Sequence, residues 1–236
     1  AARSVAKNKP VIVVKSGRSE NGKKASRSHT GSLAIKDEIF DAVCRQSGII
    51  RVKDFEELID VAKAFALQPL PNGNRVAIAS ITGAGCVMAA DECAEHGLEI
   101  AQLSDETIKR LASNMPSWAT VANPLDTEPL FESVGPESAA KIAIESMLED
   151  ENTDCAVFVL ATSPVFKFDI KDAILDVIKK YPNKPIAAHI IGPRDLVDFY
   201  IQQLEEEIGI PVYPSIKRSV RALAALHKYQ KIARPG

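Results

Sequence analysis

The sequence has no excess of charge of one sign and no long hydrophobic run. Its 29 Lys and Arg nearly balance 31 Asp and Glu, for a formal net charge of −2. A chain this close to neutral is not expected to bind nucleic acid or an anionic membrane through bulk electrostatics. No hydrophobic stretch approaches the roughly 18 residues that a membrane span needs. We therefore expect a cytoplasmic protein with neither kind of partner.

Cysteines are also few, and they form no CxxC pair or Cys/His cluster of zinc spacing. The four are Cys44, Cys86, Cys93 and Cys155. We expect buried free thiols and no metal site. Cys86 alone stands out, because it lies in a loop that contains glycine.

The first residues include neither an initiator methionine nor a signal-peptide segment. Residues 1–7 instead have the pattern of the end of a helix that began upstream. We therefore expect the chain to start within a domain.

Short continuous apolar runs alternate with helical patterns, which predicts an α/β fold with parallel sheets covered on both faces. Residues 67–74 hold two prolines, a glycine and two asparagines, the composition of a linker. We divide the chain there into residues 1–70 and 71–236. The second part should contain five strands, at 75–81, 98–103, 154–160, 185–190 and 211–213, and six helices, at 84–96, 105–113, 136–149, 169–181, 194–208 and 215–230.

Five strands with helical crossovers predict a flavodoxin-like sheet of order 2-1-3-4-5. Ligands of such sheets bind where the strand order reverses, at the loops after the first and third strands. The first part offers two strands, at 10–15 and 49–52, and helices at 32–46 and 54–66. Two strands leave unpaired edges and a thin core, so this unit should be truncated.

Residues 16–31, between the first strand and the helix at 32, carry the most distinctive chemistry. They hold four cations against the single acid Glu20, and they are rich in Ser and Gly. A structureless connection of this length is usually functional or disordered. Because it ends at an expected helix N-terminus, it favours a bound phosphate.

His29 lies immediately before that expected helix. The helix dipole would keep the imidazole neutral, as a nitrogen nucleophile must be, and would then stabilise a phosphoryl group on the ring. The residues alone leave two interpretations open: a phosphoryl carrier, or a solvated or capping histidine.

Several motifs together resemble the NDP-forming acyl-CoA synthetases, relatives of succinyl-CoA synthetase. They are Lys-Ser-Gly-Arg at 15–18, Ser-His-Thr-Gly-Ser at 28–32, Thr-Gly-Ala-Gly at 82–85 and Asn-Pro-Leu-Asp at 123–126. The resemblance covers nearly the whole chain. It implies two succinyl-CoA synthetase-type units: the C-terminal part of a phosphohistidine-bearing ligase domain at 1–70, and a second flavodoxin-like CoA-ligase domain at 71–236.

By this resemblance, the chain is a fragment of the alpha-type portion of an enzyme that interconverts acyl-CoA, ADP and phosphate with acid, CoA and ATP, through an acyl phosphate and a phosphohistidine. The family's histidine motif makes His29 the catalytic residue. Residues implied to bind phosphate are Ser28, Thr30, Gly31, Ser32, Thr82, Gly83, Ala84, Gly85, Thr162 and Ser163, with Arg27, Asn123 and Asp126 as candidates for support. In relatives the loop at 162–164 leads into a second helix N-terminus that faces the phosphate.

The resemblance also implies partners. Coenzyme A and Mg-ATP or ADP should bind mainly in a Rossmann-like CoA-binding domain and an ATP-grasp domain or subunit, neither of which lies in this chain. By itself, the chain should therefore not catalyse the complete reaction, and it should hold no cofactor of its own. We also expect it to be part of an oligomer. Many relatives have Gly-Gly-Pro-Gly in place of the Thr-Gly-Ala-Gly at 82–85.

Two alternatives differ in class from a ligase. A non-catalytic module of a fused acyltransferase would have no need of the nucleophile His29. A flavin-binding flavodoxin would need aromatic residues beside the flavin ring in the loops after the first and third strands of 71–236; the first of these loops, Thr-Gly-Ala-Gly at 82–85, has none, which disfavours this alternative.

Overall fold

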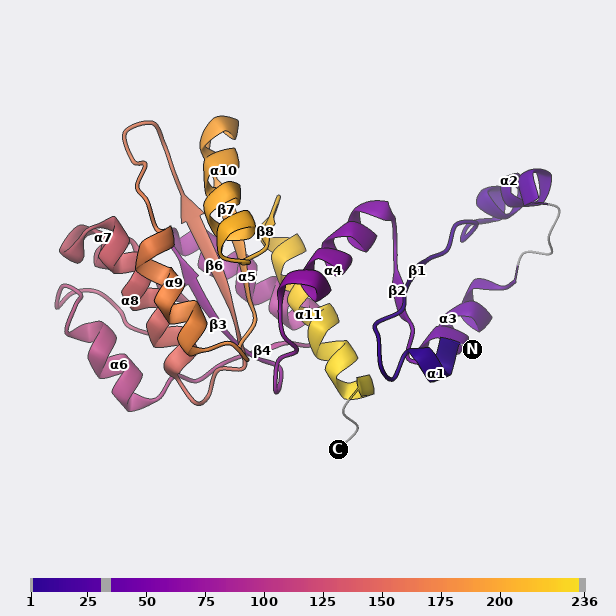
Figure 1. Ribbon diagram of the computed structural model, residues 1–236, viewed down its shortest axis with the longest axis horizontal. Coiled ribbons are helices and arrows are strands. Elements are labelled where there is room, and N and C mark those ends of the chain that lie inside the picture. Colours follow the sequence, from indigo (N-terminus) through magenta and orange to yellow (C-terminus); the bar gives the residue numbers. More distant parts are fainter. Residues whose placement is uncertain (1, 31–34, 234–236) are drawn as a thin grey trace. The chain divides into compact units, whose positions relative to one another are not determined.

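The computed structural model describes residues 2–30 and 35–233, with residues 27–30 described in their backbone only (Figure 1). The described chain forms two compact units. Unit 1 comprises the residues up to Lys63 together with those from Lys228 on, and unit 2 runs from Ala64 to His227. The boundary predicted at residues 70 and 71 lies a few residues further along, and the sequence did not indicate that the last residues group with unit 1.

Unit 1 is built around two parallel strands. Its elements are α1 (Ala2–Val5), β1 (Ile12–Val14), α2 (Glu20–Thr30), α3 (Asp37–Ser47), β2 (Ile50–Val52) and the greater part of α4 (Phe55–Leu67). β1 pairs with β2 in the register Ile12 to Ile50 and Val14 to Val52. The two strands were predicted at nearly these residues.

Unit 2 contains the larger sheet. Its elements are β3 (Arg75–Ser80), α5 (Gly83–His96), β4 (Glu99–Ile100), α6 (Asp105–Ala112), β5 (Leu125–Asp126), α7 (Glu128–Val134), α8 (Pro136–Glu149), β6 (Cys155–Ala161), α9 (Lys171–Lys180), β7 (Ile186–Ile191), α10 (Arg194–Ile201), the π-helix η1 (Gln202–Glu207), β8 (Val212–Tyr213) and most of α11 (Ile216–Ala233). The strands are parallel, in the order β4-β3-β6-β7-β8. This is the predicted order 2-1-3-4-5.

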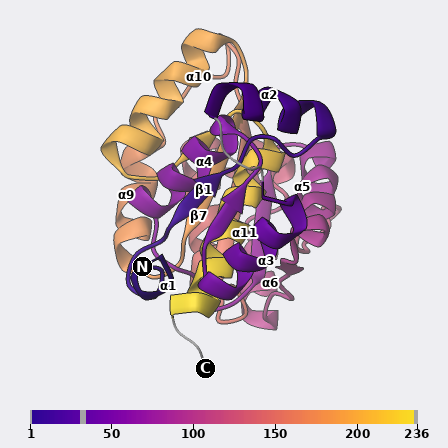
Figure 2. The ribbon, with the colours of Figure 1, turned by 90° about the vertical axis from the view of Figure 1, so that its right-hand side faces the viewer.

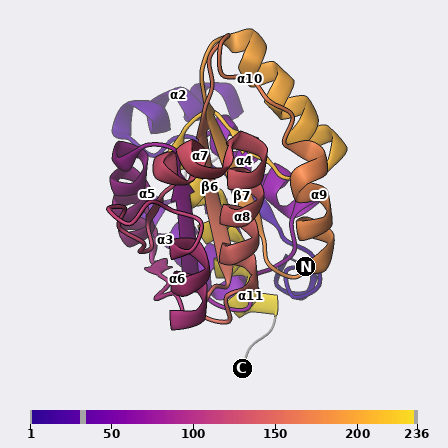
Figure 3. The same cartoon turned by 90° about the vertical axis from the view of Figure 1, so that its left-hand side faces the viewer.

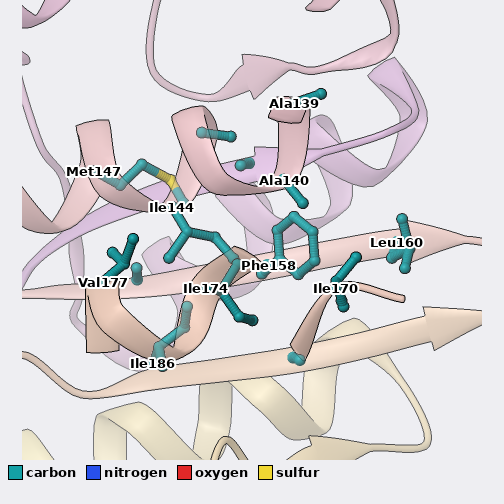
Figure 4. Packing of buried hydrophobic residues seen from close by; sticks show 14 of the residues in the cluster. Ala139, Ala140, Ile144, Met147, Phe158, Leu160, Ile170, Ile174, Val177 and Ile186 are labelled. Carbon is teal, nitrogen blue, oxygen red and sulfur yellow. The ribbon is translucent and has the colours of Figure 1, made fainter. Parts of the chain in front are cut away.

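Helices cover both faces of this sheet, as the continuous apolar strands require. Figure 3 shows α7, α8 and α9 over β6 and β7, and α5 and α11 pack on the opposite face, the side from which Figure 2 is viewed. The first face is filled by Ile144 and Met147 of α8, Ile174 of α9 and Phe158 of β6, all nearly inaccessible (Figure 4). The two clusters make unit 2 a three-layer α/β/α structure.

Helix ends follow the local sequence. Ser104 caps α6, because its hydroxyl accepts a hydrogen bond from the Thr107 backbone N–H. Gly97 ends α5 in the left-handed conformation at φ 73°, which a glycine adopts without steric cost. None of the described helices is long and apolar enough to cross a membrane.

Two expectations about secondary structure were wrong. The predicted structureless connection at 16–31 contains the helix α2, and the helix predicted from residue 32 begins only at Asp37. The sequence also gave no sign of β5 or α7.

Candidate anion site at the carboxyl edge of the unit 2 sheet

The loop between β3 and α5 is shaped by two hydroxyl groups. Thr82 is the N-cap of α5, and its Oγ1 accepts a hydrogen bond from the Gly85 N–H at 3.0 Å. Ser80 Oγ accepts from the Thr82 N–H at 3.2 Å and donates to the Thr82 carbonyl at 2.8 Å. These bonds fix the turn from strand to helix although the Gly-Gly-Pro-Gly of many relatives is replaced here by Thr-Gly-Ala-Gly.

The first residues of α5 leave donors available. Gly83 and Ala84 are exposed, and no described residue accepts a hydrogen bond from their backbone N–H groups. The first N–H groups of a helix have no partner within it, and the helix dipole adds positive partial charge there. The start of α5, a helix of 14 residues, is therefore suited to an anion such as phosphate.

Asp126 faces the same helix start. One carboxylate oxygen accepts a hydrogen bond from the Glu128 N–H at 3.1 Å, and a Cβ atom on Gly83 would lie 3.3 Å from the other oxygen. Asp126 thus orders the turn into α7 and also brings negative charge beside the donors of α5. An anion bound at Gly83 would have to tolerate this carboxylate.

The Asn123 side chain completes the hydrogen bonding of β3. β3 pairs with β4 near its start and with β5 near its end. Between these pairings, the Asn123 amide accepts from the Ile78 N–H at 2.8 Å and donates to the carbonyls of Val76 and Ala101 at 2.8 and 2.9 Å. The side chain proposed from the family motif as site support is fully engaged in the fold.

The loop after β6 does not have the structure that we expected from the family resemblance. Thr162 is buried, and its hydroxyl donates to the Phe166 carbonyl at 2.8 Å, so it does not donate to a phosphate in this structure. Ser163 and Phe166 form a tight turn, and the next helix starts only at Lys171. The resemblance had implied a second helix N-terminus at this loop, but no helix starts directly after Ser163. Thr82, Gly83, Ala84 and Gly85 remain the phosphate-site candidates that the described structure brings together.

The motif that carries His29 lies on α2. The backbone of Ser28, His29 and Thr30 belongs to the last turn of this helix, together with that of Arg27, whereas Gly31 and Ser32 lie outside the described residues. The helix expected from residue 32 begins at Asp37. The premise that His29 stands immediately before a helix N-terminus therefore does not hold among the described residues.

The cysteines are buried free thiols, as predicted. Burial raises the pKa of Cys86 to about 11, with a further contribution from the Asp126 charge. The thiol is therefore protonated at neutral pH and is not a nucleophile.

One group of described residues has the spacing of metal ligands: Glu92, Glu95 and His96 on α5. The ammonium of Lys217 lies 3.2 Å from a Glu92 oxygen and 3.5 Å from a Glu95 oxygen. These carboxylates therefore already have a cation. Burial lowers the pKa of His96, and its ring is neutral at neutral pH.

Sequence reasoning missed Ser80, which shapes the anion site from the end of β3. Ser80 is fully buried between its two bonds to Thr82. A serine at the end of an apolar strand was the available signal, because a buried hydroxyl needs partners.

Together, these features describe an α/β protein with a flavodoxin-like parallel sheet, and the helix start at the switch point of that sheet has the geometry of an anion site. Residues 1–65 match the family described as succinyl-CoA ligase like flavodoxin domain. The resemblance to NDP-forming acyl-CoA synthetases is thereby confirmed, and the chain matches part of their alpha-type portion.

Among individual relatives, the chain is 42% identical to acetate–CoA ligase [ADP-forming] II of Archaeoglobus fulgidus, over 94% of this chain and 33% of that protein. It is 35% identical to the alpha subunit of acetate–CoA ligase [ADP-forming] I of Pyrococcus furiosus, over 98% and 49%. The chain thus spans a third to a half of these relatives.

A solved structure shares the fold. It is that of the dinucleotide forming acetyl-coenzyme A synthetase 1 of Candidatus Korarchaeum cryptofilum in complex with phosphate and ADP. The match has a TM-score of 0.85 at 27% identity and covers 98% of this chain and 49% of that one.

Proposed function

We propose that the chain is part of an NDP-forming acyl-CoA synthetase, an acid–thiol ligase, in which His29 carries the phosphoryl group. The proposal rests on one observation: nearly the whole chain is similar to ADP-forming acetate–CoA ligases, and it contains the Ser-His-Thr-Gly-Ser motif. The relatives named above are all ligases or synthetases, which favours this reading over a non-catalytic module of an acyltransferase.

The reaction then has three balanced steps. Phosphate displaces CoA from acyl-CoA and gives an acyl phosphate and the free thiol. A ring nitrogen of His29 attacks the phosphorus, the bond from phosphorus to the acyl oxygen breaks, and the carboxylate leaves. An oxygen of ADP then takes the phosphoryl group, which breaks the P–N bond and restores the imidazole.

Each unit has its own part in this proposal. In this proposal, the phosphoryl group on His29 is bound by Ser28, Thr30, Gly31 and Ser32, with Arg27 in support. In unit 2, the N–H groups of Gly83 and Ala84 hold a phosphate, in a turn that Thr82 and Gly85 shape.

The remaining components lie in partners. A Rossmann-like CoA-binding domain and an ATP-grasp domain or subunit would bind CoA and Mg-ATP, in a cytoplasmic oligomer. By itself the chain would not complete the cycle, and the acyl substrate would be chosen elsewhere.

Phosphoryl transfer to His29 can be measured directly. The complete enzyme is incubated with γ-labelled ATP and Mg²⁺, and acid-labile, base-stable label on this chain is counted. We expect His29→Asn to abolish the label, because the asparagine amide is not a nucleophile. His96→Asn is the matched control and should label as the wild type does.

Label that persists at full level in His29→Asn would refute the assignment of the carrier. Failure of the wild-type enzyme to label under any nucleotide would refute the ligase function itself.

A further inference from the structure

A cluster of charged residues lies at the base of the segment that carries His29. This segment, residues 19–36, connects β1 to α3 within unit 1. Asp37, the first residue of α3, accepts a bond from Arg51 Nη2 at 2.6 Å and lies 3.4 Å from Lys15 Nζ. Arg51 belongs to β2, and its Nη1 lies 3.4 Å from Asp41. The end of the segment is thus held by the neighbouring strand.

The start of the segment is tied to the same strand. Arg18 Nη2 donates to the Val52 carbonyl of β2 at 2.6 Å, and its Nε donates to the Lys15 carbonyl at 3.3 Å. β2 therefore holds both ends of the segment, one through Arg18 and the other through Asp37.

These contacts are better shielded than an ordinary surface ion pair. The side chains of Arg51 and Lys15 are only 11% and 15% exposed. Both cations also lie over the Phe40 ring, at 5.4 and 5.7 Å from its centroid. Partial burial reduces solvent screening, so a fixed geometry is more strongly favoured here than in a fully exposed pair.

The charge state of Asp37 agrees with this geometry. Its hydrogen bond from Arg51 holds the pKa of the carboxyl below its usual range, against a smaller effect of burial. The carboxylate is therefore ionised throughout the neutral range.

We propose that Arg51 and Asp37 are positioning residues for phosphoryl transfer, which fix the base from which His29 is presented. This inference rests on the proposed function of His29. Asp37 lies eight positions after His29 in the sequence, so a fixed Asp37 confines the backbone of His29 to within roughly 26 Å of it, at about 3.3 Å per residue. Loss of the anchor would widen the range of positions and lower the fraction of productive encounters.

The test separates positioning from simple stabilisation. In the complete enzyme, Arg51→Gln, Asp37→Asn and the double variant are compared for the initial rate of His29 labelling per folded molecule. Arg45→Gln is the matched control, because Arg45 pairs with Asp41 on the exposed side of the same helix. Thermal unfolding of each variant is recorded alongside.

We expect each single variant to slow labelling by about tenfold or more, with the final amount of label on His29 preserved. The double variant should be no slower than the slower single variant, because both act through one contact. Arg45→Gln should label at the wild-type rate.

Unchanged labelling rates, or effects that multiply in the double variant, would overturn the inference and leave the carrier role of His29 intact. Absence of label from the wild type, or label that survives His29→Asn, would instead refute the proposed function.

Discussion

At the scale of single residues, position 85 accepts only glycine. A Cβ atom there would overlap Ser80 Oγ and lie 3.0 Å from Thr82 Oγ1. Ser80 is fully buried and cannot move aside without losing its bonds to Thr82. We expect Gly85→Ala to lower the free energy of unfolding by about 1–3 kcal/mol, measured by urea denaturation.

Gly83→Ala is the control for this prediction. The nearest atom to a Cβ on Gly83 is an Asp126 oxygen at 3.3 Å. Gly83→Ala should lower the free energy of unfolding distinctly less than Gly85→Ala does. Equal losses from the two variants would show that the contact with Ser80 does not govern the turn.

The sequence predicted which loops matter better than what each side chain does there. Thr82 and Gly85 were recognised by motif and by their place after the first strand. The hydrogen bond from the Thr162 hydroxyl to the Phe166 carbonyl was not predicted, because it depends on a turn four residues long that no local sequence pattern indicates. The same holds for Asn123, whose partners lie 22 to 47 residues away in the sequence.

At the scale of elements, one amide joins two short strands to β3. Asn123→Ala would leave the Ile78 N–H and the Ala101 carbonyl without this partner, whereas the Val76 carbonyl would keep its hydrogen bond from the Ala101 N–H. Unpaired buried backbone groups cost about 1–3 kcal/mol each. We expect Asn123→Ala to lower the free energy of unfolding by at least about 2 kcal/mol, measured by urea denaturation.

Asn114→Ala provides the comparison. The Asn114 amide donates to the Arg110 carbonyl near the end of α6, where water can replace it. This variant should cost less than about 1 kcal/mol. A similar loss from both variants would argue against a special role of Asn123 in the sheet.

Long elements were predictable because their apolar pattern is strong, and short ones were not. β6 reads as a continuous apolar run and was found within one residue at each end. β5 has two residues, too few for any periodicity. The helix α2 was missed because its serines and glycine resemble a loop, although its Glu20 and Lys23 form an ion pair one turn apart.

At the scale of the whole molecule, the two units differ in how fully their strands are paired. β6 has a partner on each side and core on both faces, whereas β1 and β2 have only each other among the described strands. We expect the amides of β6 to exchange with deuterium far more slowly than those of β1 and β2. Equal protection in the two sheets would contradict this.

The same difference explains why unit 2 was the easier to predict. The five strands β4-β3-β6-β7-β8 restrict their own order through short right-handed crossovers, so this order followed from the sequence. The grouping of residues from Lys228 on with unit 1 did not, because it depends on contacts such as that of Ile232 with Gly48, almost two hundred residues away.

The split pairing of β3 has a consequence for how this protein can diverge. The chain leaves the side of β3 at Ala101 and comes back to the same side at Asn123. The Asn123 amide there bonds to the carbonyl of Ala101 and to that of Val76 in β3. Insertions or deletions between these points need not disturb the hydrogen bonding of β3. Homologues can therefore remodel this side of the molecule by changing the size of one excursion, provided that the asparagine stays.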